Sequence, residues 1–197
     1  SGNQPQFIKQ FREEINKNNV AFFSYDKRTS IPSNIELIKE NGIVIDDLIA
    51  DVKQVVDHFK EDKRFTKIVL IGHSQGALLG LMALEHVDQY ISLSGTAETI
   101  DKTIVKQVTA QNAELGKIAK KQLEELKETK EIQQVNPFLM SLFAKQNQAF
   151  LWTWMQLNPE NIIRDVDIPL LIINGDKDLQ VPIDNAEKLR AANPNAE

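Results

Sequence analysis

The chain has 197 residues, of which 42% are hydrophobic and 26% charged, a balance typical of a globular domain that can bury a core. It contains no cysteine, which excludes a disulfide framework, thiolate metal sites and a cysteine nucleophile. The net charge of −5 gives no electrostatic support to a nucleic-acid or anionic-membrane partner, and no apolar run approaches the roughly 18 residues that span a bilayer.

The first part of the chain predicts helices and strands in alternation. Apolar residues at helical spacing predict an amphipathic helix over residues 7–15, and a short buried strand is expected over residues 20–25. Residues 45–59 carry apolar side chains at i, i+3, i+4 and i+7 throughout, which predicts the clearest helix of the chain. Residues 68–71 are a continuous apolar run that ends at Gly72, typical of a buried parallel strand.

The same alternation continues beyond the glycine. Residues 75–86 predict a helix with little polar character, and residues 90–93 predict the next strand. A later strand over residues 168–173 precedes a final helix over residues 183–192. Strands that alternate with helices favour an α/β fold, with a parallel sheet covered by helices on both faces.

One long stretch interrupts the alternation. Residues 97–165 are almost all helical in character, which is too long for a simple crossover and indicates an insertion between two strands. Within it, residues 117–130 are rich in Lys and Glu without a strong apolar stripe, so a solvated helix is expected there. The predicted organisation is a core in two parts with one helical insertion: residues 1–96, 166–197 and 97–165.

A short motif follows the strand over residues 68–71. Gly72-His73-Ser74-Gln75-Gly76 matches G-x-S-x-G, in which the chain turns sharply from strand to helix and exposes the serine hydroxyl. The motif has glycine at positions 72 and 76 because the strand and the helix are expected to pass close together there. The backbone N–H of Gln75 would then face a developing oxyanion. The alternative is a glycine-rich turn in which Ser74 only caps the helix.

A candidate acid lies after the later strand. A catalytic triad needs a carboxylate that orients a histidine and stabilises its cationic form, and the chain order Ser…Asp…His is that of the α/β-hydrolase fold. Asp176 and Asp178 both follow the strand over residues 168–173. Asp176 directly follows a glycine, where an aspartate readily bonds its own backbone in a turn.

At these motifs the sequence resembles the bacterial serine carboxylesterases of the α/β-hydrolase superfamily. In that group a strand is followed by Gly-x-x-Asp-x-x-Val-Pro, which Gly175, Asp178, Val181 and Pro182 match, so Asp178 is favoured over Asp176. Further matches are Tyr25-Asp26-Lys27-Arg28, with Thr29 in place of the usual Gly, Trp154 and Asn158-Pro159. The resemblance covers nearly the whole chain and implies an α/β-hydrolase fold, a helical cap at residues 97–165 and ester hydrolysis through an acyl-enzyme.

Two parts of such a protein are expected to lie outside this sequence. The triad histidine should follow Asp178 after one more strand, whereas the histidines present are His58, His73 and His86. Each of the three is expected to be structural or exposed, His73 because its place in the elbow points it away from the nucleophile. Their spacing predicts no metal site.

The second expected gap is a strand of the sheet. In this fold it lies in the sheet between the strand over residues 20–25 and the strand over residues 68–71, and its loop supplies the other oxyanion donor. A sheet that lacked it would leave unpaired backbone in its middle. We therefore expect the sequence to be an interior portion of a longer protein. Alone it should be inactive, because an unassisted serine is a poor nucleophile.

The sequence thus predicts a serine carboxylesterase that acts on a small-molecule ester, with neither cofactor nor metal. Ser74 attacks, Asp178 orients the histidine and the Gln75 amide stabilises the oxyanion. Trp152 and Trp154 either contact the acyl group or bury the cap against the body. Peptidases, thioesterases and acyltransferases use the same machinery. An inactive binding module is the alternative of a different class, and the absence of nucleotide-binding glycine motifs disfavours a nucleotide-binding protein.

Overall fold

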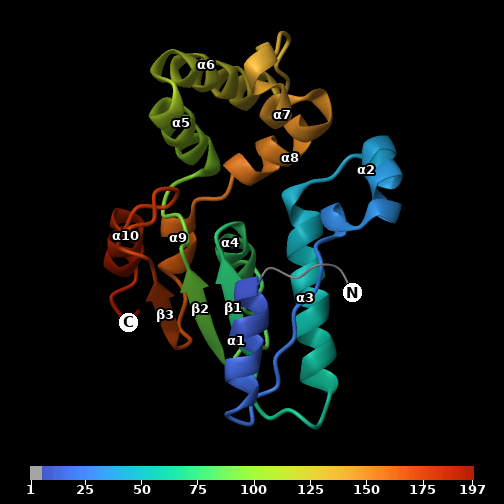
Figure 1. The fold of residues 1–197 in the computed structure, drawn as a ribbon, viewed down its shortest axis with the longest axis vertical. Helices are drawn as coiled ribbons and strands as arrows, with labels where there is room; N and C mark the ends of the chain where they lie inside the picture. Colours follow the sequence, from blue (N-terminus) through green and yellow to red (C-terminus); the bar gives the residue numbers. More distant parts are fainter. Residues whose placement is uncertain (1–5) are drawn as a thin grey trace. The chain divides into compact units, whose positions relative to one another are not determined.

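The computed structural model describes residues 6–197 (Figure 1), and the chain divides into two compact units whose boundary lies between Asn41 and Gly42. The first unit contains helices α1 (Gln6–Asn16) and α2 (Ile35–Asn41) and the short 3-10 helices η1 (Arg28–Ser30) and η2 (Pro32–Asn34). Helix α1 confirms the helix predicted over residues 7–15. Its Phe11 ring packs edge to face on Phe22, with 5.8 Å between the ring centroids.

The strand predicted over residues 20–25 is wrong. The structure has irregular backbone there, and Val20 and Phe23 are 53% and 56% exposed. An apolar run predicts burial, but a strand also needs hydrogen bonds to a neighbouring strand. In the described sheet each of the three strands pairs with another of the three, and residues 20–25 are not part of that ladder.

The second unit is built on a parallel sheet of strands β1 (Val69–His73), β2 (Gln89–Leu93) and β3 (Leu170–Ile173), in the order β1-β2-β3. These strands confirm the three predicted over residues 68–71, 90–93 and 168–173. Glu197 bonds to the free side of β3: its N–H donates to the carbonyl of Leu170 at 3.0 Å, and its carbonyl accepts from the N–H of Ile172 at 2.8 Å. One residue that bonds to two alternate residues of its neighbour is the pattern of a parallel ladder.

Helices cover one face of this sheet. They are α3 (Ile45–Glu61), α4 (Gln75–Leu81), α9 (Pro159–Ile163) and α10 (Asp184–Ala192). Leu81, Ile163 and Leu189 from three of them form one buried cluster with Tyr90 and Leu170 of the sheet. Side chains of the opposite face, which alternate with these along the strands, include the partly exposed Val69, Leu171 and Ile173. Within this unit the predicted helical cover is therefore seen on one face.

Helix α4 is shorter than predicted. It ends at Leu81, whereas the apolar pattern extends the helix to residue 86. The N–H of Ala83 bonds to the carbonyl of Gly80, three residues back, which tightens the last turn. His86 then adopts a φ of 65°, which a right-handed helix cannot contain. The apolar residues beyond Leu81 are thus buried by a turn rather than by a helix.

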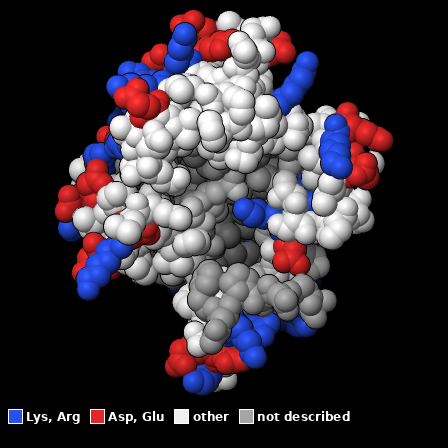
Figure 2. Space-filling view, turned by 45° about the horizontal axis from the view of Figure 1, so that its top comes forward, with Lys and Arg blue, Asp and Glu red and all other residues white. Residues whose placement is uncertain are grey.

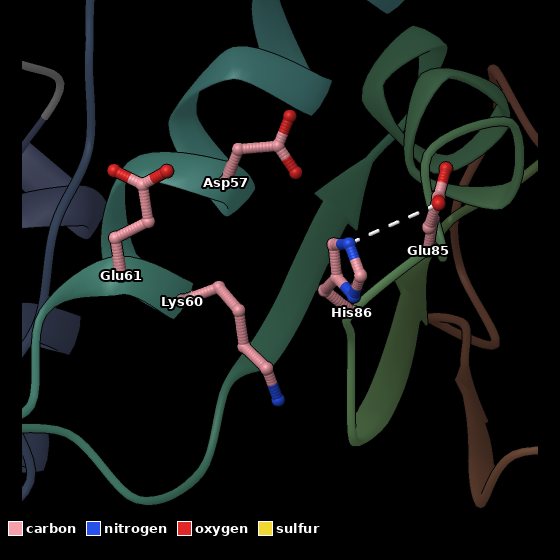
Figure 3. Close-up of a pocket in the computed structure, with 5 residues that line it drawn as sticks. All are labelled: Asp57, Lys60, Glu61, Glu85 and His86. Carbon is pink, nitrogen blue, oxygen red and sulfur yellow. Dashed lines mark ion pairs between the residues drawn. The ribbon is translucent and has the colours of Figure 1, made fainter.

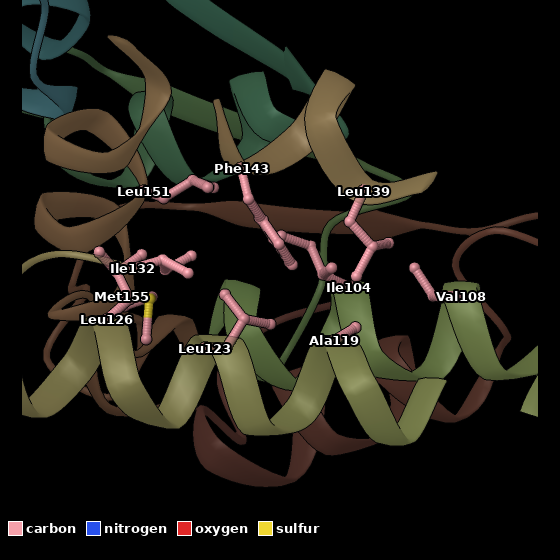
Figure 4. Packing of buried hydrophobic residues seen from close by; sticks show 10 residues of the cluster. All are labelled: Ile104, Val108, Ala119, Leu123, Leu126, Ile132, Leu139, Phe143, Leu151 and Met155. Atoms are coloured by element: carbon pink, nitrogen blue, oxygen red, sulfur yellow. The ribbon is translucent and has the colours of Figure 1, made fainter. Parts of the chain in front are cut away.

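The long stretch between β2 and β3 is helical, as predicted. It contains α5 (Ile100–Gln111), α6 (Ala113–Thr129), η3 (Pro137–Leu139), α7 (Met140–Phe143) and α8 (Lys145–Met155) in addition to α9. In Figure 1, α5 to α8 lie beyond the carboxyl ends of the strands. These helices have a core of their own, shown in Figure 4: Ile104, Val108, Ala119, Leu123, Leu126, Ile132, Leu139, Phe143, Leu151 and Met155.

Helix α6 is not the solvated helix expected over residues 117–130. Its Ala119, Leu123 and Leu126 are at most 2% exposed, because they fall at i, i+4 and i+7 and face the core of the helical layer. The stripe is narrow, and Lys and Glu fill the remaining faces. A narrow stripe is sufficient here because α5, α7 and α8 supply the rest of the core.

The helical layer is attached to the body through α8. The N–H of Ile45, at the start of α3, donates to Oγ1 of Thr153 at 3.1 Å. Phe150 and Trp154 on the same helix pack against the cluster that α3 forms with α4. Because the first N–H groups of a helix lack partners within it, this bond satisfies one of them from a segment 108 residues away.

The described surface carries charges of both signs. Figure 2 shows Lys and Arg side chains interspersed with Asp and Glu on the face drawn, so neither sign gathers there into a large patch. No helix within residues 6–197 is long and apolar enough to cross a membrane.

Candidate active site

Ser74 occupies the turn between β1 and α4. Its backbone has φ 55° and ψ −117°, a strained conformation for a residue with a side chain. The turn is held by two bonds of Ser74: its N–H donates to the carbonyl of Leu93 at 2.9 Å, and its carbonyl accepts from the N–H of Ala77 at 2.9 Å. Ser74 is exposed, as is His73 before it. No side-chain cap bond from Ser74 to α4 is present, which disfavours the alternative of a plain helix cap.

The two glycines of the motif differ in their surroundings. A Cβ on Gly72 would lie 2.2 Å from the carbonyl oxygen of Gly76 and 2.8 Å from Cα of Ala77, so strand and helix do meet there. A Cβ on Gly76 would meet nothing within 4 Å among the described residues. The close approach expected at both glycines is therefore present at Gly72 and absent at Gly76, whose carbonyl, rather than its Cα, faces the strand.

Asp178 lies in the loop after β3, and its own backbone neighbours hold its carboxylate. Oδ1 accepts from the N–H of Gln180 at 2.9 Å and from the N–H of Val181 at 3.0 Å. The bond from Val181 contributes most to a pKa below the usual range of an aspartate. Partial burial opposes this, and the Gln180 amide, the Ser94 hydroxyl and the charge of His73 reinforce it. Asp178 is thus a carboxylate fixed in the ionised form, whereas Asp176 is exposed.

Two residues that support this loop were missed in the sequence. Asn174 closes the loop, since its Nδ2 donates to the carbonyl of Val181 at 2.9 Å. Ser94 follows β2 with a φ of 46°, and its N–H donates to the carbonyl of Ile173 at 2.8 Å, which turns it toward Asp178. A strand that ends in Leu93-Ser94-Gly95 gives a weak turn signal. Nothing in the sequence connects that turn to Asp178.

The parallel sheet brings the serine and the carboxylate to one end. Ser74 follows β1, Ser94 follows β2 and the Asp178 loop follows β3, each at the carboxyl end of its strand. Strands β1 and β3 are two spacings apart, about 10 Å. An imidazole that makes a hydrogen bond at each nitrogen spans roughly 8 Å. The spacing of the two strands that carry Ser74 and the Asp178 loop is therefore similar to the span of a histidine with two hydrogen-bond partners.

Of the three histidines of the sequence, His58 and His86 lie on other segments, whereas His73 directly precedes Ser74 and is near enough to Asp178 for its charge to lower the pKa of that carboxyl. His58 is exposed on α3, where its ring contacts Phe59. His86 is exposed beside Glu85, with 3.8 Å between Nε2 and Oε1. His73 alternates along β1 with Gly72, which faces α4, so its side chain leaves the opposite face of the sheet. Among residues 6–197 no group of His, Asp and Glu side chains is arranged to hold a metal ion.

The two tryptophans proposed as substrate contacts are half-buried on α8. Trp152 packs against the core of the helical layer, and the Lys130 ammonium lies 4.4 Å from the centre of its ring. Trp154 packs edge to face on Phe150, with 5.6 Å between centroids, against the α3 and α4 cluster. Both rings therefore contribute to packing, whatever their role toward a substrate.

A depression of about 250 Å³ lies away from Ser74 and Asp178 (Figure 3). Its lining is charged and consists of Asp57, Lys60, Glu61, Glu85 and His86. These residues end α3 and precede β2, so they lie near the amino ends of the strands. Ser74 and Asp178 lie at the carboxyl ends, and the depression is therefore not part of the candidate site.

A family model described as BD-FAE, an α/β-hydrolase-type family, matches residues 2–192, nearly the whole chain. The comparison with curated proteins gave no significant match.

Solved structures share the fold. The structure of a protein named as a non-heme bromoperoxidase, BpoC of Mycobacterium tuberculosis, is 14% identical, with a TM-score of 0.53 over 88% of this chain and 69% of that protein. An esterase of Pyrococcus furiosus is 24% identical, with a TM-score of 0.51 over 78% of this chain. The match spans about half of that esterase, 52% of its chain. At these identities the likeness establishes the α/β-hydrolase fold alone.

Proposed function

The chain belongs to the BD-FAE family and has the α/β-hydrolase fold, and we propose that it cleaves carboxylic esters through an acyl-enzyme on Ser74. The observation that carries the proposal is the backbone of Ser74, strained at φ 55° and ψ −117° between a parallel strand and a helix. Strain at an exposed serine is retained where the position of its hydroxyl matters. A serine that only capped the helix would not need it.

The proposed reaction has two halves. Oγ of Ser74 attacks the acyl carbon while a histidine takes its proton, and the N–H of Gln75, the first residue of α4, donates to the oxyanion. The alkoxide leaves with the proton from that histidine, and an acyl-enzyme remains. Water then attacks the acyl carbon, gives a proton to the same histidine and releases the carboxylic acid, while Oγ of Ser74 recovers its proton.

The role of Asp178 in this scheme is to orient that histidine. Support comes from its two backbone donors, which occupy Oδ1 and keep the group ionised, so that Oδ2 can accept from an imidazole. The scheme requires a histidine other than His58 and His86, which lie on other segments, and other than His73, whose side chain leaves the sheet on the face opposite α4. The assay therefore uses the natural protein that contains this sequence.

We extend the proposal to the helical layer of α5 to α8 as a cap over Ser74, with Trp152 and Trp154 in contact with the acyl group. Support comes from the course of the chain, since the layer follows the carboxyl end of β2 (Figure 1). If the cap sets the acyl pocket, Trp154→Phe should raise KM for long acyl chains more than for short ones. An equal change for all chain lengths would limit Trp154 to packing.

The test is hydrolysis of p-nitrophenyl esters of increasing acyl length, with Ser74→Ala as the control. Activity that disappears in the variant supports the proposal, and the preferred chain length describes the pocket. If the natural protein hydrolyses no ester, the proposal fails. A non-catalytic binding protein with an α/β-hydrolase fold then becomes the better description.

A further inference from the structure

One peptide group joins the helical layer to the carboxylate of Asp178. It is the group between Gln180 and Val181. Its carbonyl accepts from Nε2 of Gln107 on α5 at 3.2 Å. Its N–H donates to Oδ1 of Asp178 at 3.0 Å. A hydrogen bond accepted at the carbonyl end of a peptide polarises the N–H at the other end, so the two bonds strengthen each other.

The same N–H is the strongest of the groups that keep Asp178 ionised. Gln107 is half-buried on the side of α5 that faces the loop, 73 residues from Gln180 in sequence. Without Gln107, the remaining partner of this peptide group in the described part of the chain would be Asp178 of its own loop. A bond from another element therefore restrains the loop where it matters most for the carboxylate.

The amino end of α5 is fixed to the same region by charge. Glu98, just before α5, bonds to Lys106 on the helix at 2.6 Å and to Lys188 on α10 at 3.0 Å. The carboxylate of Glu98 is only 19% exposed, whereas the side chains of Lys106 and Lys188 are 62% and 39% exposed. Its pKa lies below the usual range because of Lys106 first and Lys188 second. Glu98 thus holds α5 and α10 together as one support.

A neutral bridge runs beside the charged one. The N–H of Ala97 donates to Oδ1 of Asn185 at 3.0 Å, and Nδ2 of Asn185 donates to the carbonyl of Pro182 at 3.0 Å. Asn185 is 8% exposed. The segment that enters the helical layer and the end of the Asp178 loop are therefore tied at the base of α5, which leaves little freedom for Gln107 to drift from Gln180.

We propose that Gln107 is a positioning residue for Asp178, acting from helix α5 through the Gln180–Val181 peptide group. The inference rests on the proposed function of Asp178 as the triad acid. It makes the helical layer part of the support of that acid, so that a displacement of α5 would change the rate of the chemical step and not only access to Ser74.

The experiment compares Gln107→Ala and Gln107→Glu with Gln111→Ala and Gln111→Glu in the natural protein that contains this sequence. Gln111 is exposed on the last turn of the same helix, which makes it a matched control for helix propensity and charge. Both Gln107 variants should lower kcat for ester hydrolysis by about 3- to 10-fold, with KM little changed. Gln107→Glu should be the weaker enzyme, because it keeps the shape and places a carboxylate oxygen against the carbonyl oxygen of Gln180, which repels it.

A role in packing alone predicts the opposite order, with the isosteric Gln107→Glu close to wild type. The pKa of the Asp178 carboxyl, followed by carbon-13 NMR, gives a readout that needs no activity. It should rise in both Gln107 variants and stay unchanged in the Gln111 variants. If the wild type hydrolyses no ester but this pKa rises, the proposed function fails and the coupling stands. An unchanged pKa together with wild-type kcat in the Gln107 variants would overturn the inference.

Discussion

The hydroxyl of Tyr90 donates to the carbonyl of Ala77, which bonds the central strand to the first turn of the helix that begins after Ser74. Tyr90 is fully buried, and its ring packs on Gly80 so closely that a Cβ at Gly80 would lie 2.6 Å from Cε2 of Tyr90. Helix α4 therefore rests on one tyrosine at two places. The elbow that presents Ser74 is supported from the middle of the sheet.

Removal of this hydroxyl should be visible in the stability of the protein at high pH. Burial raises the pKa of Tyr90 above its usual value of 10. The folded protein then holds the phenol proton more tightly than the unfolded chain does. The stabilisation that the protonated Tyr90 provides is therefore complete below a pH of about 10 and is lost as the pH rises above it. Tyr90→Phe should cost about 1 kcal/mol at neutral pH and should reduce the alkaline loss. Urea unfolding at about pH 8 and about pH 11 measures both effects.

Tyr25→Phe is the control, since it alters the other tyrosine of the chain, which is 39% exposed. It should leave the alkaline loss of the wild type in place. An alkaline loss of equal size in Tyr90→Phe would show that other groups cause it.

The two glycines of the elbow should respond in opposite directions to alanine. Gly72→Ala should destabilise the protein by about 3 kcal/mol, because the new methyl group would collide with the backbone of Gly76 and Ala77. Gly76→Ala should stabilise α4 by about 0.5–1 kcal/mol, because it meets open space and removes chain entropy within a helix. Free energies of unfolding from urea titrations test both. Equal losses in the two variants would contradict the difference in their surroundings.

The two aspartates after β3 should differ in their effect on catalysis. Asp178→Asn should lower kcat/KM for ester hydrolysis by about 10³- to 10⁴-fold, because an amide there favours the wrong tautomer of the catalytic histidine. Asp176→Asn should stay within about 2-fold of wild type, because its side chain is exposed in the turn. Steady-state kinetics on one ester decide the matter. A larger loss in Asp176→Asn would reverse the assignment.

The buried stripe of α6 should dominate the stability of the helical layer. Leu126→Ala removes a fully buried side chain and should cost about 2–5 kcal/mol. Ile118→Ala on the same helix removes one that is 38% exposed and should cost about 0.5 kcal/mol. Urea unfolding followed by tryptophan fluorescence reports on this layer, since both tryptophans lie on α8. Similar costs would mean that α6 is solvated on all sides.

Periodicity predicted the elements that local pattern determines. The helix over residues 45–59 and the three parallel strands are confirmed, because each carries its burial pattern in its own sequence. The prediction of a strand over residues 20–25 was wrong, because a strand forms only by hydrogen bonding to a neighbouring strand, which the local pattern does not reveal. Helix α6 was misjudged because a stripe of three small or medium side chains is enough when other helices complete the core.

The candidate site divides in the same way. The pattern around Ser74 predicted a sharp turn, and the structure has one, since that turn is made by adjacent residues. The supports of Asp178 could not be predicted, because Ser94 and Gln107 reach it from segments 84 and 71 residues away in the numbering. Such contacts exist only once the parallel strands have brought their carboxyl ends together.

The most direct test of Ser74 as the nucleophile is covalent modification of the natural protein that contains this sequence. The protein is treated with a fluorophosphonate, and the adduct is mapped by mass spectrometry of its peptides. We expect one adduct, on Ser74, and none in Ser74→Ala, whereas Ser94→Ala should still be modified on Ser74. A protein that remains unmodified, or an adduct on another residue that persists in Ser74→Ala, would contradict the proposed mechanism.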